Sequence, residues 1–389
     1  MQRVSRRRVR RSENGIMIPE LNAAMANTEI KSFLRNESSP DILDALSEDD
    51  GSNHESDATA RVASSRSNSS AKLPLAWKVH ELAMLVAMHA RRLWHADRLP
   101  NIFHPLYEYD QLLKKYSNLE LQKARVFEIG FGQRAGRMIA LASLGIDAYG
   151  VDLDAPLLEG KPKELYEIYR KNGLERLLKS LVRFSFFDLI WRRRLRKELQ
   201  RRDCKLVLPA DRLLVQDAAT IDFPNFSFDL IISESVFEHI PLSSLKPLIA
   251  KMSCLLKPTG LALIRPDIFT GISGGHLVEW FRVDAQRQHK KSRGHLNKGT
   301  RLVERPRRSE PWEHLRKKRF HANVYLNELT RGDYRRLFSE YFEIVEEKVT
   351  KPNLGREFLS PEVAKDLMGY SEDELFSNGV LFVLRPRTV

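Results

Sequence analysis

The stretch ARVFEIGFGQRAGRMIALASLGIDAYGVDLDAP, residues 124–156, places glycines and acids where apolar runs end. Gly130 and Gly132 carry no side chain that would keep a ligand from the backbone, and the helix expected after them presents its N-terminal amides to an anionic group. Asp152 follows Glu128 by 24 residues, where a carboxylate can accept hydrogen bonds from two ribose hydroxyls. This spacing predicts half of a nucleotide-type pocket.

Two further segments add polar groups after apolar runs. In LLVQDAATIDF, the Asp217 carboxylate could accept from an exocyclic adenine amine while the backbone N–H of Ala218 faces a ring nitrogen. In FDLIISESVFEHI, Glu234 comes at the tip of a buried strand, and a helical turn with Glu238 and His239 follows. We expect all of these groups at one edge of a sheet.

The glycine loop departs from the full dinucleotide fingerprint. Arg134 occupies the approximate place of the third glycine, and Gly136 lies beyond it. Glycine-bearing turns are common, so the loop alone is equally compatible with a structural turn. The acid at Asp152 favours a ligand pocket over that alternative, although acids at strand ends are also common.

Short β-rich runs alternate with segments of helical spacing from residue 121 onward, including RLLVQD, FDLIISES, GLALIRPD, YFEIVEEKV and GVLFVLRP. This alternation predicts an α/β fold with a doubly wound, mainly parallel sheet. Two long segments interrupt it, at about residues 155–205 and 270–320, and we interpret them as insertions with helices that wall the pocket. Between the last two strands, Ser360 with Pro361 and Ser371 with Glu374 predict helix starts, the second as a capping box.

The predicted α/β domain spans residues 121–389, and two segments precede it. Residues 1–72 are polar and predicted to be a disordered tail, and residues 73–120 form a predicted helical lead-in. The arginine-rich start could be a solvated tail, a transit peptide or a nucleic-acid arm. The tail holds 11 Lys and Arg against 11 Asp and Glu, so the net charge of +13 belongs to the part predicted to fold.

Cysteine, histidine and hydropathy patterns limit the class of protein. Cys204 and Cys254 are the only cysteines, too few for a disulfide framework or a cysteine metal cluster. His80, His89, His95 and His104 show no paired ligand spacing, so no metal site is predicted. No run of about 18 uncharged apolar residues and no secretory signal is seen, which predicts a cytoplasmic protein without a transmembrane segment.

The motifs FEIGFG, VDLD, QDA, FDLIISESVFEHI and LLKPTGLALI occur in an order that resembles the class I S-adenosylmethionine-dependent methyltransferases, most closely the branch acting on small molecules and glycans. The resemblance implies a Rossmann-like methyltransferase fold and S-adenosyl-L-methionine as cofactor. It also implies which residues bind the cofactor: Glu128, Gly130, Gly132, Asp152, Asp217, Ala218 and Glu234.

Methyl transfer requires mainly that an acceptor be held in line with the sulfonium methyl. A hydroxyl acceptor must also lose its proton, for which His276 and His239 are the candidate bases, with Glu279 and Glu238 behind them. His276 lies in SGGHLVEW after the fifth strand, where glycines let the chain bend over the pocket. Trp280 could wall a sugar face or belong to the core.

The positive charge of the two insertions suggests a class of acceptor but does not determine it. Residues 170–202 contain 12 Lys and Arg against 3 acids, and residues 282–320 contain 14 against 4, which suggests an anionic substrate or simply solvated helix faces. The first hypothesis is a methyltransferase for a saccharide or other small polar acceptor, including phosphate-bearing or lipid-linked ones. The alternatives are an RNA methyltransferase, which lacks a recognisable RNA-binding module here, and a non-catalytic cofactor-binding scaffold.

Overall fold

The computed structural model describes residues 83, 84, 87, 103–280, 306, 309–320 and 325–387. The predicted tail, most of the predicted lead-in and much of the second predicted insertion lie outside these residues. Within them, no helix combines the length and apolarity needed to cross a membrane.

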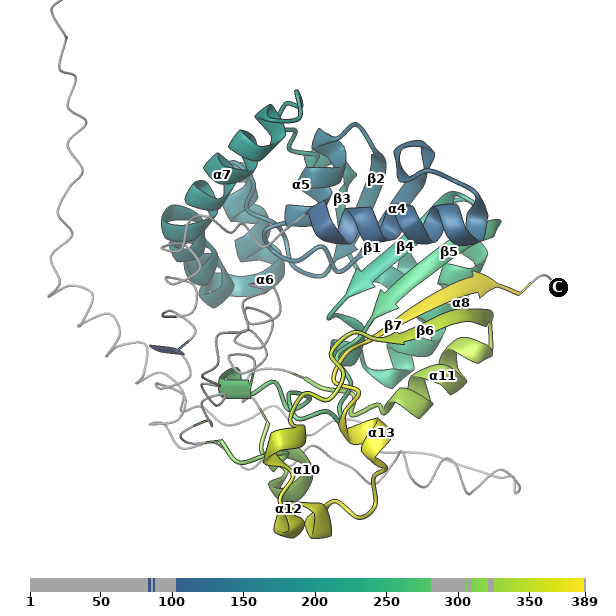
Figure 1. Cartoon of the computed structure of the whole chain (residues 1–389). Coiled ribbons are helices and arrows are strands. Elements are labelled where there is room, and N and C mark those ends of the chain that lie inside the picture. The colour runs from purple at the N-terminus through teal and green to yellow at the C-terminus, as the bar shows by residue number, and fades with distance from the viewer. Residues whose placement is uncertain are drawn as a thin grey trace, which may run out of the picture. The chain divides into compact units, whose positions relative to one another are not determined.

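A seven-stranded sheet of order β3-β2-β1-β4-β5-β7-β6 forms the centre of the fold (Figure 1). Its strands are β1 (Arg125–Ile129), β2 (Asp147–Asp152), β3 (Leu213–Val215), β4 (Phe228–Glu234), β5 (Leu256–Arg265), β6 (Phe342–Val349) and β7 (Val380–Pro386). The first five pair in parallel, whereas β7 runs antiparallel to both β5 and β6. The predicted doubly wound, mainly parallel sheet is confirmed.

Helices cover both faces of this sheet. They are α4 (Phe103–Ser117), α5 (Gly136–Ser143) and α7 (Leu189–Gln200) on one face, and α8 (Leu242–Leu255) and α11 (Arg331–Ser339) on the other. The other described helices are α6 (Pro162–Arg183), α10 (Glu313–Lys317), α12 (Pro361–Asp366) and α13 (Glu372–Leu375), of which the last three lie beyond the sheet edge (Figure 1). A π-helical turn, Phe184–Asp188, joins α6 to α7. The predicted helical insertion after the second strand is therefore present.

Alternation along the buried strands explains the two layers. In β4, Leu230 and Ile232 pack into a core with α4, α5 and α7, while Ile231 between them packs into a second core with α8 and α11. Side chains of a strand point alternately to opposite faces, so a run of apolar residues buries both. Two helical layers follow directly from sequences such as FDLIISE.

A third apolar cluster lies beyond the sheet edge. It joins residues after β5 to the β6–β7 connection and includes Phe269, Trp280, Trp312, Leu354 and Phe376. The Trp312 indole N–H donates to the Thr270 carbonyl over 3.0 Å. Trp280 is 1% exposed, so it belongs to this core and is not a wall of an acceptor pocket.

Candidate active site

The glycine loop after β1 combines one tightly packed and one open position. Gly130 has φ +81°, and a Cβ there would lie 2.2 Å from Val236 Cγ2. Gly132 has φ +64°, yet a Cβ there would meet no atom within 4 Å. The first glycine is therefore required by packing, whereas the second leaves open space beside the backbone. That space fits a cofactor lying against the loop.

Glu128 is buried at the end of β1. Its Oε1 accepts a 2.6 Å hydrogen bond from Arg137 Nη1, and the residue is 2% exposed. Burial, opposed by the Arg137 guanidinium, raises the pKa of Glu128 to about 7. The carboxyl end of β1 thus carries a group that changes its protonation near neutral pH.

Asp152 ties the second strand to the glycine loop. Its Oδ2 accepts from Gly132 N over 2.7 Å, and its Oδ1 accepts from Asp154 N over 2.9 Å. A carboxylate offers about four acceptor sites, so two of them still suit ribose hydroxyls. Burial raises the pKa of Asp152 despite these two amide donors.

Asp217 and Ala218 occupy the corresponding position after β3. Asp217 is exposed, and its Oδ1 accepts from Ala219 N over 2.9 Å at the start of a short helical turn, Ala218–Thr220. Gln216 N donates to Asp152 O, so the two acids stand on neighbouring strand ends. Both acids therefore lie at the same edge of the sheet, and their roles toward ribose and adenine stay predictions.

Glu234 lies in a network of charged side chains. Its Oε2 accepts from Arg137 over 2.8 Å, and its Oε1 accepts from Arg265 over 3.0 Å and from the Tyr109 hydroxyl. Burial acts to raise the pKa of Glu234, but the two guanidiniums outweigh it and lower that pKa. These contacts anchor α4 to the sheet through Tyr109, while the contact of Glu234 with the cofactor stays a prediction.

Arg134 explains the missing third glycine. Its Nε donates to Asp188 Oδ1 over 2.7 Å, and Arg183 Nε donates to Asp188 Oδ2 over 3.0 Å. Asp188 is fully buried at the joint between α6 and α7. The insertion is thus fastened onto the glycine loop, which sequence reasoning missed. The available signal was an acid among the basic residues of this insertion.

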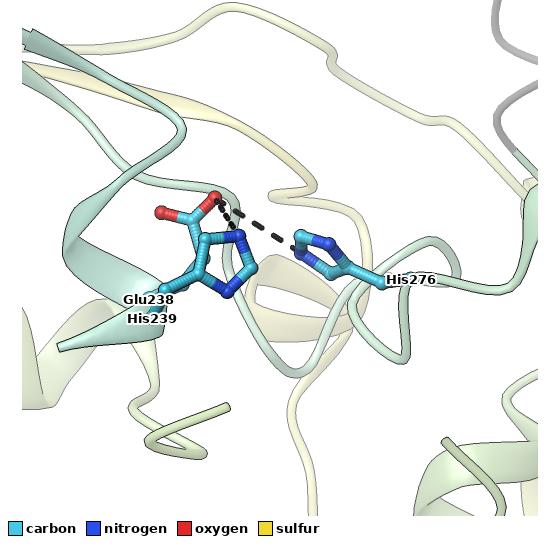
Figure 2. A group of neighbouring side chains, drawn as sticks. All are labelled: Glu238, His239 and His276. Carbon is cyan, nitrogen blue, oxygen red and sulfur yellow. Dashed lines mark ion pairs between the residues drawn. The ribbon is translucent and has the colours of Figure 1, made fainter. Parts of the chain in front are cut away.

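Glu238, His239 and His276 converge at the carboxyl ends of β4 and β5 (Figure 2). His239 Nε2 lies 3.8 Å and His276 Nε2 lies 4.0 Å from Glu238 Oε1. The two rings meet edge to face with centroids 4.8 Å apart. Two predicted bases and one predicted supporting acid are therefore brought together.

Close packing of glycines positions His276, which itself has φ +57°. A Cβ on Gly274 would lie 2.1 Å from the Phe269 carbonyl oxygen, and one on Gly275 would lie 2.6 Å from His314 Cβ. The expectation that glycines bend the chain here thus has a packing basis. Glu279, predicted beside His276, instead accepts from Ser309 N over 2.8 Å and is not part of the three-residue group.

Comparison with known proteins finds a matching family. The sequence matches the family described as "Methyltransferase domain" over residues 190–264, a segment that contains β3, β4 and all of β5 except Arg265. No curated protein matches the chain in sequence.

Solved structures of methyltransferases resemble the chain distantly. A SAM-dependent methyltransferase from Archaeoglobus fulgidus is 11% identical, with a TM-score of 0.34, over 72% of this chain and 94% of that one. The 1,6-didemethyltoxoflavin-N1-methyltransferase of Burkholderia thailandensis is 13% identical, with a TM-score of 0.35, over 82% and 94%. Geranyl diphosphate C-methyltransferase of Streptomyces coelicolor is 13% identical, with a TM-score of 0.35, over 72% and 78%. Likenesses at this level carry no information about the acceptor.

The match of residues 190–264 to a methyltransferase domain and the doubly wound sheet order support a class I S-adenosylmethionine-dependent methyltransferase. Its cofactor is S-adenosylmethionine. The loop at Gly132 and the acids Asp152 and Asp217 fit that cofactor, because open space, a ribose acceptor and an exposed acid follow one another along the strand ends.

Proposed function

We propose that this enzyme methylates a hydroxyl of a small polar acceptor of the saccharide type, including anionic or lipid-linked ones. One observation carries the proposal: His239, His276 and Glu238 meet beside the cofactor edge of the sheet. An alcohol is not nucleophilic enough while it keeps its proton, so a hydroxyl acceptor needs a group that takes this proton. An amine acceptor would not need such a group.

When bound, S-adenosylmethionine supplies an electrophilic methyl group on a sulfonium sulfur. The chain's own residues hold and orient the cofactor. Asp152 binds the ribose hydroxyls, and Asp217 and the N–H of Ala218 bind adenine. The Gly130–Gly132 loop lies against the methionine part. Glu128 and Glu234 support that part through Arg137, which both contact.

The acceptor lies between this edge and the imidazoles in the proposed arrangement. His276, whose side chain is 11% exposed, is the first candidate base. His239 is the second, because the Tyr325 carbonyl 3.0 Å from its Nδ1 keeps the proton there and leaves Nε2 as acceptor. Glu279 stays a candidate for a supporting role only, because it holds a loop near His276.

Basic residues of the insertion support an anionic acceptor. Arg193, Arg196 and Lys197 are exposed on α7, while Arg134 and Arg183 both pair with Asp188, whose single charge offsets one of the two guanidiniums. An exposed cluster of one sign raises the local concentration of oppositely charged ligands. An RNA acceptor would exploit the same charge and is the second candidate.

Transfer of radiolabelled methyl from S-adenosylmethionine into cell extract tests the acceptor class. We expect label in nuclease-resistant material that follows the carbohydrate or lipid fraction. His276→Ala should lower this transfer at least about tenfold, as removal of a general base does, while His104→Ala, an exposed residue of α4, should not. Nuclease-sensitive label would favour RNA, and cofactor binding without transfer to any pool would favour a scaffold.

A further inference from the structure

Glu238 is a buried carboxyl group that faces two imidazoles but accepts no hydrogen bond from the described residues. The residue is 3% exposed, and among the described residues neither Oε1 nor Oε2 accepts a hydrogen bond. The nearby Lys351 ammonium lies 3.0 Å from Asp267 Oδ1, and its charge also acts on Glu238. Buried charges are generally paired or bound to metals, because an isolated one is costly. A cation bound at the Glu238 oxygens would stabilise the ionised form of this group.

The two imidazoles present ligand atoms to the same point (Figure 2). One ligand atom from each of Glu238, His239 and His276 lies within 4.8 Å of the others. In a shell with bonds of about 2.1 Å, neighbouring donors lie roughly 3.0–3.4 Å apart. The measured separations of 3.8 and 4.0 Å from Glu238 Oε1 would need to close by less than about 1 Å.

His239 also has the orientation that metal-binding histidines use. The Tyr325 carbonyl can only accept, so Nδ1 carries the proton and the Nε2 lone pair faces Glu238. Such a second hydrogen bond fixes the tautomer and direction of a ligating ring. The backbone of His276 has a left-handed conformation that non-glycine residues rarely adopt. The closely packed glycines before it hold this conformation and so fix the position of the second ring.

We infer that Glu238, His239 and His276 form a binding site for one divalent metal ion, with Zn²⁺ or Mn²⁺ as the fitting ions. Two imidazoles and one carboxylate suit ions of this borderline class better than Mg²⁺ or Ca²⁺, which prefer oxygen ligands only. Three protein ligands leave coordination positions open for a substrate oxygen.

The use of this ion rests on the proposed function. An ion held there would lower the pKa of an acceptor hydroxyl, whose proton then passes to solvent water. The two histidines would then act as ligands and not as general bases. Metal binding itself does not depend on methyl transfer.

Metal titration of the full chain tests the site. The protein is stripped with a chelator and titrated with Co²⁺, whose visible absorption reports imidazole and carboxylate ligands, and Zn²⁺ and Mn²⁺ are titrated by calorimetry. We expect one ion per chain, displacement of Co²⁺ by Zn²⁺, and binding at least about tenfold weaker in His239→Ala, His276→Ala and Glu238→Gln. His104→Ala is the matched control and should bind as the parent does.

Circular dichroism of each variant establishes that it is folded, and S-adenosylmethionine titration of the same samples separates the two proposals. Absence of stoichiometric binding, or equal affinity in the parent and all three variants, would overturn the metal site. Cofactor binding that persists in that case would leave the proposed function standing, with the histidines as direct bases.

Discussion

At the scale of single residues, the two loop glycines have separable tasks. Gly130 is locked by its left-handed backbone and by Val236, whereas Gly132 borders open space. An alanine at either position would have to adopt the left-handed backbone conformation, which costs about 1–2 kcal/mol of folding free energy. Only at position 130 does the new methyl also collide with a neighbour.

We expect Gly130→Ala to lower the free energy of unfolding by about 3 kcal/mol, from backbone strain and overpacking together. Gly132→Ala should lower it by only about 1 kcal/mol but weaken S-adenosylmethionine binding at least about tenfold, because the methyl occupies the cofactor's space. Urea unfolding and calorimetry measure the two effects. Equal stability losses with unchanged cofactor affinity would refute this division.

Glu128 makes stability depend on pH. Its pKa is about 7 in the fold against an ordinary value of 4.5, so the folded state holds the proton more tightly. Stability from this group is therefore present at acidic pH and is lost as pH rises from about 4.5 to 7, by up to about 3 kcal/mol. Arg137, Glu234 and Asp152 are the charged neighbours that set the value.

Glu128→Gln removes this titration. Relative to the parent, the variant should gain stability between pH 5 and pH 8, by up to about 3 kcal/mol. Urea unfolding at both pH values measures the difference. A stability difference between variant and parent that is the same at both pH values would contradict the assignment.

Residue types and spacing identified the strand-end positions but not all of their partners. Asp152 and Asp217 could be predicted because an acid after an apolar run comes to the same sheet edge in any parallel sheet. The network of Glu234 with Tyr109 and Arg265 could not, since those partners are 125 and 31 residues away in the chain. His276, His239 and Glu238 were predicted as bases and supporting acid, but not as one metal-binding group, because His276 lies 37 residues beyond His239 and shows no ligand spacing with it.

At the scale of elements, the insertion is fastened to the cofactor loop at one point. Asp188 is buried and receives both Arg134 and Arg183. Removing one partner of a buried ion pair leaves the others uncompensated. Because the two guanidiniums are partly exposed here, the cost is smaller than for a fully buried pair.

Asp188→Ala should therefore lower the free energy of unfolding by about 2 kcal/mol and increase amide hydrogen exchange in α6, α7 and the glycine loop. Glu175→Ala is a matched control, since its ion pair with Lys179 is exposed and contributes less than about 0.5 kcal/mol. Hydrogen exchange that changes in α6 and α7 but not in the loop would argue against this coupling.

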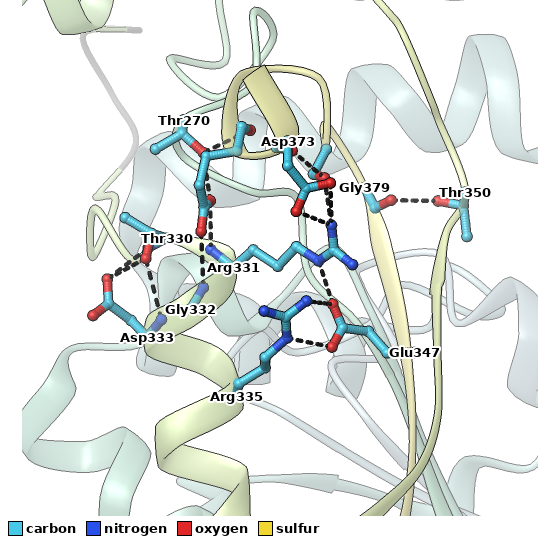
Figure 3. Close-up of polar contacts among 12 residues, drawn as sticks. Thr270, Thr330, Arg331, Gly332, Asp333, Arg335, Glu347, Thr350, Asp373 and Gly379 are labelled. Atoms are coloured by element: carbon cyan, nitrogen blue, oxygen red, sulfur yellow. Dashed lines mark hydrogen bonds and ion pairs between the residues drawn. The ribbon is translucent and has the colours of Figure 1, made fainter. Parts of the chain in front are cut away.

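A second set of polar contacts joins α11 to the β6–β7 connection (Figure 3). Arg331 contacts Asp373 over 2.8 Å and also pairs with Glu347, which accepts from Arg335 as well. Ser360 and Ser371 cap α12 and α13 as predicted. The predicted capping box is only half formed, because the Glu374 carboxylate accepts instead from Arg331 N and Gly332 N. A local pattern could not reveal this tertiary competitor.

At the scale of the whole described domain, periodicity was sufficient for the sheet. Apolar runs flanked by polar residues predicted every strand from β1 to β7, because strands buried on both faces are nearly continuous apolar segments. The edge strand β6 is the exception, since it mixes apolar and charged residues. The contacts between the insertions and the sheet were not predictable, because they depend on single buried pairs such as Arg134 with Asp188.

The central claim is that the strand ends bind S-adenosylmethionine through Asp152. Calorimetric titration of the full-length parent and Asp152→Ala tests it, with exposed Asp222→Ala as the control. We predict one cofactor per chain for the parent and control, and affinity at least about tenfold weaker for Asp152→Ala, since hydrogen bonds to a charged group contribute about 1.5–3 kcal/mol each. Absence of binding to the parent, or equal affinity for a folded Asp152→Ala, would contradict the account.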